Sequence, residues 1–161
     1  MKLKYLLILA ITLIYGCTTA ASVTQTPAKP VIAINTNTQH IKSGTFVAGE
    51  HDTTGGARII SENGKNYLGL DANFKTSNLG PDLYVILHRS NDVLASTKPP
   101  AYPLKAGDYV VLGRLQNYNG AQRYAIASNI DLANYQSAVI WCRLFNATFG
   151  TAKLSNLLPK K

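Results

Sequence analysis

The stretch TGGARIISENGKNYLGLD, residues 54–71, decides the fold class of this chain. Two short apolar segments flank Asn63-Gly64, and turn-forming residues bound them on both outer sides. A two-residue turn of type I′ needs a positive φ at both central residues, and Asn-Gly adopts that conformation readily. The stretch therefore predicts a β-hairpin whose turn is formed by residues 63 and 64.

The chain after Lys42 continues in the same pattern of short strands and turn residues. GPDLYVILHRS, residues 80–90, follows a Gly-Pro break, and STKPPAYPLKAGD, residues 96–108, predicts a loop punctuated by prolines. No stretch carries a helical apolar stripe. Several short strands at fairly regular spacing are typical of an antiparallel β-sandwich. We therefore predict an all-β chain with one antiparallel β-sandwich domain over residues 41–158.

A second Asn-Gly pair occurs in YVVLGRLQNYNGAQRYAIA, residues 109–127. By the same argument it predicts a second hairpin around Asn119-Gly120. If its loop has two residues, Leu115 faces Tyr124 in this hairpin. Gly113 then faces Ile126.

The N-terminus, MKLKYLLILAITLIYGC, has the pattern of a bacterial lipoprotein signal. Two lysines precede a short apolar run, and Gly16 stands directly before Cys17. The apolar run is shorter than the roughly 20 residues that span a bilayer, which favours a signal peptide over residues 1–16. Cleavage near Ala20-Ala21 and an uncleaved anchor are the alternatives. The lipoprotein interpretation predicts that Cys17 carries the lipid, palmitate included.

A lipid on Cys17 places the domain outside the cytoplasm, anchored to a membrane of the cell envelope. That membrane is the outer one if the organism has one. Residues 17–40 are rich in Thr, Ala, Pro and Asn, which indicates a flexible tether between lipid and domain. Within it, VIAI at residues 31–34 could instead form an edge strand.

Charge and composition narrow the function classes. The formal net charge is +8, but the positive residues are scattered along the chain. No basic run is interleaved with aromatic residues, so we expect no nucleic-acid binding. The sequence contains no Ser-His-Asp arrangement and no paired carboxylates that would indicate a hydrolase, and we do not expect a stand-alone enzyme.

One cysteine remains after lipidation of Cys17. Cys142 lies in SAVIWCRLFNATFGTAKL, residues 137–154, which predicts one long strand or two strands joined by a bend near Asn146. Side chains alternate along a strand. The face predicted to form the main core contains Val139, Trp141, Arg143, Phe145, Ala147 and Phe149. Cys142 then lies on the opposite face, beside Ile140, where the proline loop could cover it.

Two interpretations of Cys142 stay open at this point. A free cysteine often packs as a small hydrophobe, and apolar neighbours raise the pKa of a thiol and reduce its reactivity. An unpaired cysteine in an exported protein can instead be a reactive thiol or the partner in an intermolecular disulfide.

Four segments together resemble the DM-thirteen domain family, also described as the electron-transfer DM domain. They are SGTFVAGEHDTTGGARI, LGLDANFKTSNLGPDLYVIL, LGRLQNYNGAQRYAI and YQSAVIWCRLFNATFGTAKL, spanning roughly Lys42 to Leu154. The resemblance implies a β-sandwich and a role in electron transfer or redox modification at the cell surface. It also implies that Cys142 is the family's characteristic cysteine, acting as a bare thiol or a cofactor ligand, and that His51 is the family's histidine.

Three kinds of chemistry follow from the residues and the resemblance. Cys142 could react as a redox thiol, and any disulfide step would then need a partner protein. Cys142, His51 and His88 are alternatively candidate ligands of haem or a metal, although His88 is expected to be a surface residue with satisfied hydrogen bonds. The third possibility is a lipid-anchored binding or adhesion module without catalysis.

Overall fold

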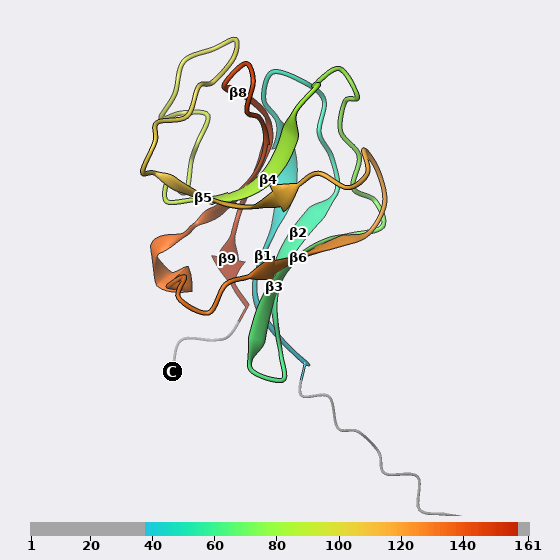
Figure 1. Cartoon of the computed structure of the whole chain (residues 1–161), viewed down its shortest axis with the longest axis vertical. Coiled ribbons are helices and arrows are strands. Elements are labelled where there is room, and N and C mark those ends of the chain that lie inside the picture. Colours follow the sequence, from blue (N-terminus) through green and yellow to red (C-terminus); the bar gives the residue numbers. More distant parts are fainter. Residues whose placement is uncertain (1–37, 158–161) are drawn as a thin grey trace, which may run out of the picture. The chain divides into compact units, whose positions relative to one another are not determined.

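The computed structural model describes residues 38–157 (Figure 1). This part of the chain is all-β, as predicted: it contains antiparallel strands and one short 3-10 turn, η1. No helix within it is long and apolar enough to cross a membrane. The elements are β1 (Thr38–Ala48), β2 (Gly56–Glu62), β3 (Lys65–Leu70), β4 (Leu83–His88), β5 (Tyr109–Arg114), β6 (Gln122–Ile126), η1 (Leu132–Asn134), β7 (Ser137–Cys142), β8 (Ala147–Lys153) and β9 (Ser155–Asn156).

The segments assigned to the signal peptide and the lipidated Cys17 lie outside the described residues, as does the VIAI stretch. Strand β1 begins at Thr38, so the last three residues assigned to the tether, 38–40, are already part of the sheet.

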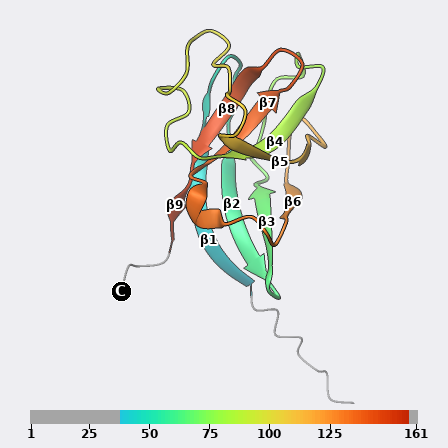
Figure 2. The ribbon, with the colours of Figure 1, turned by 60° about the vertical axis from the view of Figure 1, so that its left-hand side comes forward.

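The strands form one sheet that curls until its two edges approach each other (Figures 1 and 2). Their order is β5-β4-β7-β8-β1-β2-β3-β6, with the short β9 also paired to β1. The long strand β1 belongs to both halves, because its first part pairs with β2 while Phe46, Val47 and Ala48 pair with β8. The result is a nearly closed, sandwich-like antiparallel domain, and the predicted fold class is confirmed.

The main apolar core contains side chains from both halves of the curled sheet. Its largest fully buried members include Phe74, Phe149, Ile59, Leu68 and Ile140. Burying one such side chain contributes about 1.5–3 kcal/mol relative to leaving it exposed. This core therefore holds the two halves of the curled sheet together.

The hairpin predicted at Asn63-Gly64 is present. Glu62 pairs with Lys65 across the turn, and Asn63 and Gly64 have φ values of 51° and 75°. Both central residues thus have the positive φ that a type I′ turn requires.

The prediction of a hairpin at Asn119-Gly120 is wrong. Strand β5 pairs with β4 and β6 pairs with β3, so these two strands are the opposite edges of the sheet. Asn119 instead bridges to Lys75, and the Gly120 N–H donates to the Phe74 carbonyl at 2.8 Å. Asn119 and Gly120 are thus paired with the loop that contains Phe74 and Lys75. The expected strand pairing between residues 113–115 and 124–126 does not form.

Side chains close the seam between the β5 and β6 edges. The Tyr124 hydroxyl accepts from the Gln116 N–H at 3.0 Å and donates to Gln122 Oε1 at 2.8 Å. The Gln122 amide in turn bonds both backbone groups of Asn117, at 3.0 and 2.8 Å. Gly113 also lies against the Tyr124 ring, where an added Cβ would be 3.4 Å from Cδ1.

A second apolar cluster lies on the other face of strands β4 and β7. It contains Ile86, Val93, Leu104, Val139 and Trp141. Val93 and Leu104 belong to the loop of residues 89–108, so this loop covers Trp141, while Ala101 of the same loop packs against the main core. The predicted core face is therefore wrong for residues 139–145, but Ala147 and Phe149 do belong to the main core.

The physical reason for that error is the turn between β7 and β8. Residues 143–146 form a turn, and Cys142 pairs directly with Ala147. Side chains directly opposite each other in an antiparallel pair share a face. Ala147 therefore lies on the Cys142 side, whereas uninterrupted alternation assigned it to the Trp141 side. The bend predicted near Asn146 is confirmed.

Asn146 fastens the proline loop to this turn. Its Oδ1 accepts from the Trp141 Nε1–H and from the Leu104 N–H, both at 2.9 Å, and its Nδ2 donates to the Leu104 carbonyl at 3.0 Å. Its φ of 49° lies in the left-handed region, which asparagine tolerates better than most residues. One side chain thus joins the turn, the buried indole and the loop.

Candidate functional site

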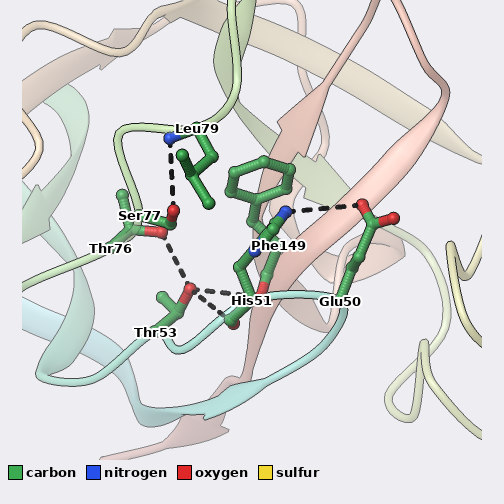
Figure 3. Close-up of polar contacts among 7 residues, drawn as sticks. All are labelled: Glu50, His51, Thr53, Thr76, Ser77, Leu79 and Phe149. Carbon is green, nitrogen blue, oxygen red and sulfur yellow. Dashed lines mark hydrogen bonds and ion pairs between the residues drawn. The ribbon is translucent and has the colours of Figure 1, made fainter.

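His51 lies in the loop between β1 and β2, at the end of the domain where β1 finishes (Figure 3). Its imidazole packs against the Phe149 ring with a centroid distance of 4.1 Å and an interplanar angle of 53°. The His51 side chain is 28% exposed, and its Nε2 is 3.9 Å from Glu50 Oε2. Neither ring nitrogen makes a hydrogen bond to residues 38–157. The imidazole is therefore held by stacking on Phe149, and its Nε2 lies near the Glu50 carboxylate without a hydrogen bond.

The loop that carries His51 is fixed to strand β8 by its backbone. The Gly49 N–H donates to the Phe149 carbonyl at 2.9 Å, and the Glu50 N–H donates to the Thr148 carbonyl at 2.8 Å. These bonds extend the pairing of β1 with β8 beyond the end of the strand. They place the residue that follows, His51, over Phe149.

Thr53 anchors the other side of the loop (Figure 3). The Thr53 hydroxyl is buried; it is hydrogen-bonded to the Thr76 hydroxyl at 2.9 Å and donates to the Phe149 carbonyl at 3.1 Å. It packs on Gly150, where an added Cβ would come within 2.7 Å of Thr53 Cγ2. Only glycine leaves room for this contact, so the sequence of β8 also determines the position of the His51 loop.

Phe149 occupies a β-bulge. Ile140 pairs with Gly150 while the next residue of β7, Trp141, pairs with Thr148, so Phe149 has no partner on β7. An extra residue of this kind bends the strand and redirects side chains, and bulges are frequent next to functional sites. Because of the bulge, the Phe149 carbonyl is free to accept hydrogen bonds from the Gly49 N–H and the Thr53 hydroxyl of the His51 loop. The alternation of side chains in the sequence did not predict this bulge.

A pocket of about 790 Å³ opens beside His51. Its walls include the exposed apolar side chains of Val47 and Leu79, which are 54% and 72% exposed, and the cationic side chain of Lys75. Cofactor sites typically measure about 300–1,000 Å³ and combine apolar walls with a few polar groups. The pocket thus combines the His51 imidazole, apolar walls, the Lys75 cation and the Asp52 carboxylate, a lining that suits a ligand of cofactor size.

Cys142 is the last residue of β7 and is completely buried. It pairs with Leu83 on one side and Ala147 on the other, and it belongs to the main apolar core. No hydrogen bond to its sulfur is found within residues 38–157, and it forms no disulfide there. In this position the thiol packs as a small hydrophobe, and no cation or histidine lies in hydrogen-bond contact to activate it.

His51 and Cys142 are connected through the core and not by direct coordination. Phe149, the platform of the imidazole, belongs to the same apolar cluster as Cys142. His51 therefore covers the outside of the core that encloses the thiol. The two residues implied by the family resemblance lie in one region of the domain, but only His51 reaches the pocket.

His88 is distant from both of these residues. It pairs with Ser137, whereas Leu83, five positions earlier on the same strand, pairs with Cys142. At about 3.3 Å per residue, His88 and Cys142 are roughly 17 Å apart along the sheet and cannot ligate one ion. No group of three potential metal ligands occurs within the described residues. His88 is also only 4% exposed, so the expectation of a surface histidine was wrong.

Burial lowers the pKa of His88 below its ordinary value of 6.5, and the nearby Asp108 carboxylate opposes part of this effect. Below pH 6.5 the unfolded chain takes up a proton that the folded chain resists. We therefore expect the free energy of unfolding to fall as the pH drops from 6.5 through the folded-state pKa. Above pH 6.5 His88 should contribute no pH dependence.

Urea unfolding at a series of pH values from about 5 to 8 measures this effect. His88→Asn is the matched variant, because an asparagine oxygen can replace Nδ1 as acceptor for the Ser90 N–H, which His88 binds at 3.0 Å. The variant should lose part of the acid-side decrease in stability. An unchanged pH profile would contradict the assignment to His88.

The chain was also compared with known proteins. The family model described as Electron transfer DM13 matches residues 45–154, which include every strand from β2 to β8 and the end of β1. The comparisons with curated proteins and with solved structures gave no significant match. The matched segment contains His51, Phe149 and Cys142, so both the site and the core described above lie within the family domain. Since the match covers well over half of the chain, this protein belongs to the DM13 electron-transfer family.

Proposed function

We propose that this protein is a lipid-anchored domain outside the cytoplasm that takes part in electron transfer, and that its redox site is the His51 pocket. Membership of the electron-transfer family supports the general role. The location is inferred from the N-terminal signal and Cys17, which precede the described residues. The single observation that carries the choice of site is the accessible, unbonded imidazole of His51 beside a pocket of cofactor size.

The residues of the pocket have distinct roles in this proposal. His51 supplies a nitrogen ligand, and Phe149 fixes the orientation of its ring. Val47 and Leu79 would supply apolar contact for a planar ring system, and Lys75 would supply a counter-charge for a carboxylate of the ligand, although the Asp52 carboxylate lines the same pocket. When bound there, haem would supply a one-electron iron couple.

Cys142 is the alternative redox centre, and the proposal treats it differently. A thiol exchanges with a partner only when it is accessible as thiolate, and Cys142 is completely buried. It would therefore work as an electron carrier only after local opening of the core. For this reason the His51 pocket is the preferred site and the bare thiol the competing one.

The position of the pocket suits exchange with a partner protein. Strand β1 begins at Thr38, where the chain enters the domain, and ends at Ala48, which lines the pocket. These positions are roughly 33 Å apart at the usual rise per residue. The pocket is thus at the end of β1 away from the point where the tether joins.

Titration of the purified chain with haemin, followed by visible absorption, tests this proposal. We expect a Soret band with the shape of a histidine complex in the wild-type chain. His51→Ala should weaken binding at least about tenfold, because a metal ligand is lost. His40→Ala is the matched control, since His40 does not line the His51 pocket, and it should bind normally.

Cys142→Ala separates the two redox sites. It should leave the haem spectrum unchanged, because Cys142 does not line the pocket. A spectrum that depends on Cys142 and not on His51 would support the thiol as ligand and overturn the pocket assignment. If the chain leaves the Soret band of haemin unchanged at every haemin concentration, the non-redox binding or adhesion module is favoured. The exposed Val47 and Leu79 would then be its contact surface.

A further inference from the structure

A second pocket, of about 570 Å³, lies between the end of β4 and the loop of residues 89–108. Its lining includes His88, Lys98, Lys105 and Asp108. It shares no residue with the His51 pocket. Neither the electron-transfer proposal nor the packing of the core uses these side chains.

His88 presents an unpartnered hydrogen-bond donor to this pocket. Its Nδ1 accepts the Ser90 N–H at 3.0 Å, so the proton of the neutral ring is carried by Nε2. His88 as a residue is only 4% exposed, and its Nε2 makes no hydrogen bond to residues 38–157. Nε2 is not among the fully buried polar atoms that lack a partner, so it remains accessible from the pocket. An acceptor atom of a ligand in the pocket could therefore take this hydrogen bond in place of water.

The charges around His88 favour an anion. Arg89, Lys98 and Lys105 line the pocket together with one acidic residue, Asp108. Neither lysine is in an ion pair with the described part of the chain. The Arg89 Nε–H is bonded to the Gly107 carbonyl at 3.2 Å, which fixes that side chain at the edge of the pocket. The local excess of positive charge would therefore be neutralised by a ligand.

The Asp108 carboxylate, which also lines the pocket, favours an anion that still carries a proton. This carboxylate makes no hydrogen bond and no ion pair to residues 38–157. A carboxylate repels a fully ionised oxyanion but accepts a hydrogen bond from one that keeps a proton. Phosphate keeps a proton at neutral pH, and sulfate does not.

We infer that this pocket binds a phosphate group, with the His88 Nε2–H as donor, Lys98 and Lys105 as counter-charges, and Asp108 as acceptor for the phosphate proton. The same chemistry fits free phosphate and, in its singly protonated form, the phosphomonoester head group of a lipid such as phosphatidic acid. The inference is independent of the electron-transfer site, since the two pockets have no residue in common.

Isothermal titration of the full chain with inorganic phosphate at pH 7.5 provides the test, with sulfate as the comparison anion. Phosphate should bind at least several-fold more tightly than sulfate. His88→Asn keeps an acceptor for Ser90 but lacks the Nε2–H, and it should weaken phosphate binding about tenfold. The double variant Lys98→Met, Lys105→Met should weaken it by a similar factor or more.

Lys153→Met is the matched charge control, because Lys153 is exposed and lies outside this pocket. It should change phosphate binding less than twofold. Equal losses in Lys153→Met and in the lysine pair would show a general effect of surface charge and overturn the inference. So would wild-type affinity in His88→Asn, equal binding of sulfate, or no phosphate binding at millimolar concentrations.

Two further measurements complete the design. Imidazole ¹⁵N spectra of the wild-type chain should show phosphate shifting the His88 Nε2 resonance, assigned with the His88→Asn variant, and an unshifted resonance would contradict the site. Flotation with vesicles containing phosphatidic acid identifies the source of the phosphate. Vesicle binding that free phosphate displaces indicates a lipid head group, and phosphate binding without vesicle binding indicates a soluble ligand.

Discussion

Replacing Asn146 with alanine is expected to destabilise the domain by about 4 kcal/mol. The substitution removes the acceptor of both the buried Trp141 Nε1–H and the Leu104 N–H, and each unsatisfied donor costs about 1–3 kcal/mol. Alanine at a φ of 49° adds about 1 kcal/mol of backbone strain. Urea unfolding monitored by circular dichroism measures the total and can also be read in variants without Trp141.

Two comparisons separate the causes of this loss. Asn146→Gly loses the same amide group as Asn146→Ala, but glycine adopts the left-handed backbone without strain. It should therefore be about 1 kcal/mol more stable than Asn146→Ala. In a Trp141→Phe background the indole donor is already absent, and Asn146→Ala should then cost clearly less than in the wild type. Equal costs in both backgrounds would show that the Trp141–Asn146 bond contributes nothing to stability.

The Cys142 thiol of the native chain is expected to react with an aromatic disulfide reagent at least about a thousandfold more slowly than in urea. Cys142 is completely buried in the main core, so modification requires opening of the surrounding strands. With a domain stability of about 5–15 kcal/mol, the population of open molecules is small enough to produce this protection. The rate of colour release by the reagent measures it directly.

The Cys142→Ala variant provides the background from Cys17, the other cysteine of the chain. In Asn146→Ala the labelling of Cys142 should accelerate about tenfold for each 1.4 kcal/mol of lost stability, if opening is global. Rapid labelling of the native wild-type chain would contradict the burial of the thiol. It would also restore direct thiol exchange as the mechanism of electron transfer.

Local signals in the sequence predicted the fold class, and contacts between distant segments produced the errors. Asn63-Gly64 and Asn119-Gly120 carry the same turn signal, but only the first lies between strands that pair. Gly120 is hydrogen-bonded to Phe74, a residue far away in the sequence. No local pattern around the second turn contains that information.

The candidate site could be predicted only in part for a similar reason. The family resemblance pointed to His51 and Cys142, and both lie within the matched domain. The platform under His51 depends on a bulge at Phe149, which shifts the register of β8 by one residue. The choice of core face depended on the turn at residues 143–146. Because Cys142 and Ala147 pair across this turn, they lie on the same face of the sheet, which simple alternation along one long strand did not predict.

The seam formed by Tyr124 and Gln122 has a consequence for copies of this domain that meet at high local concentration. Strands β5 and β6 end the sheet, and each approaches the other across this seam. An open sheet edge is a template on which a neighbouring copy can add a strand and begin to aggregate. By turning both edges toward each other, the domain withholds that template, and neighbouring copies can collide without joining their sheets.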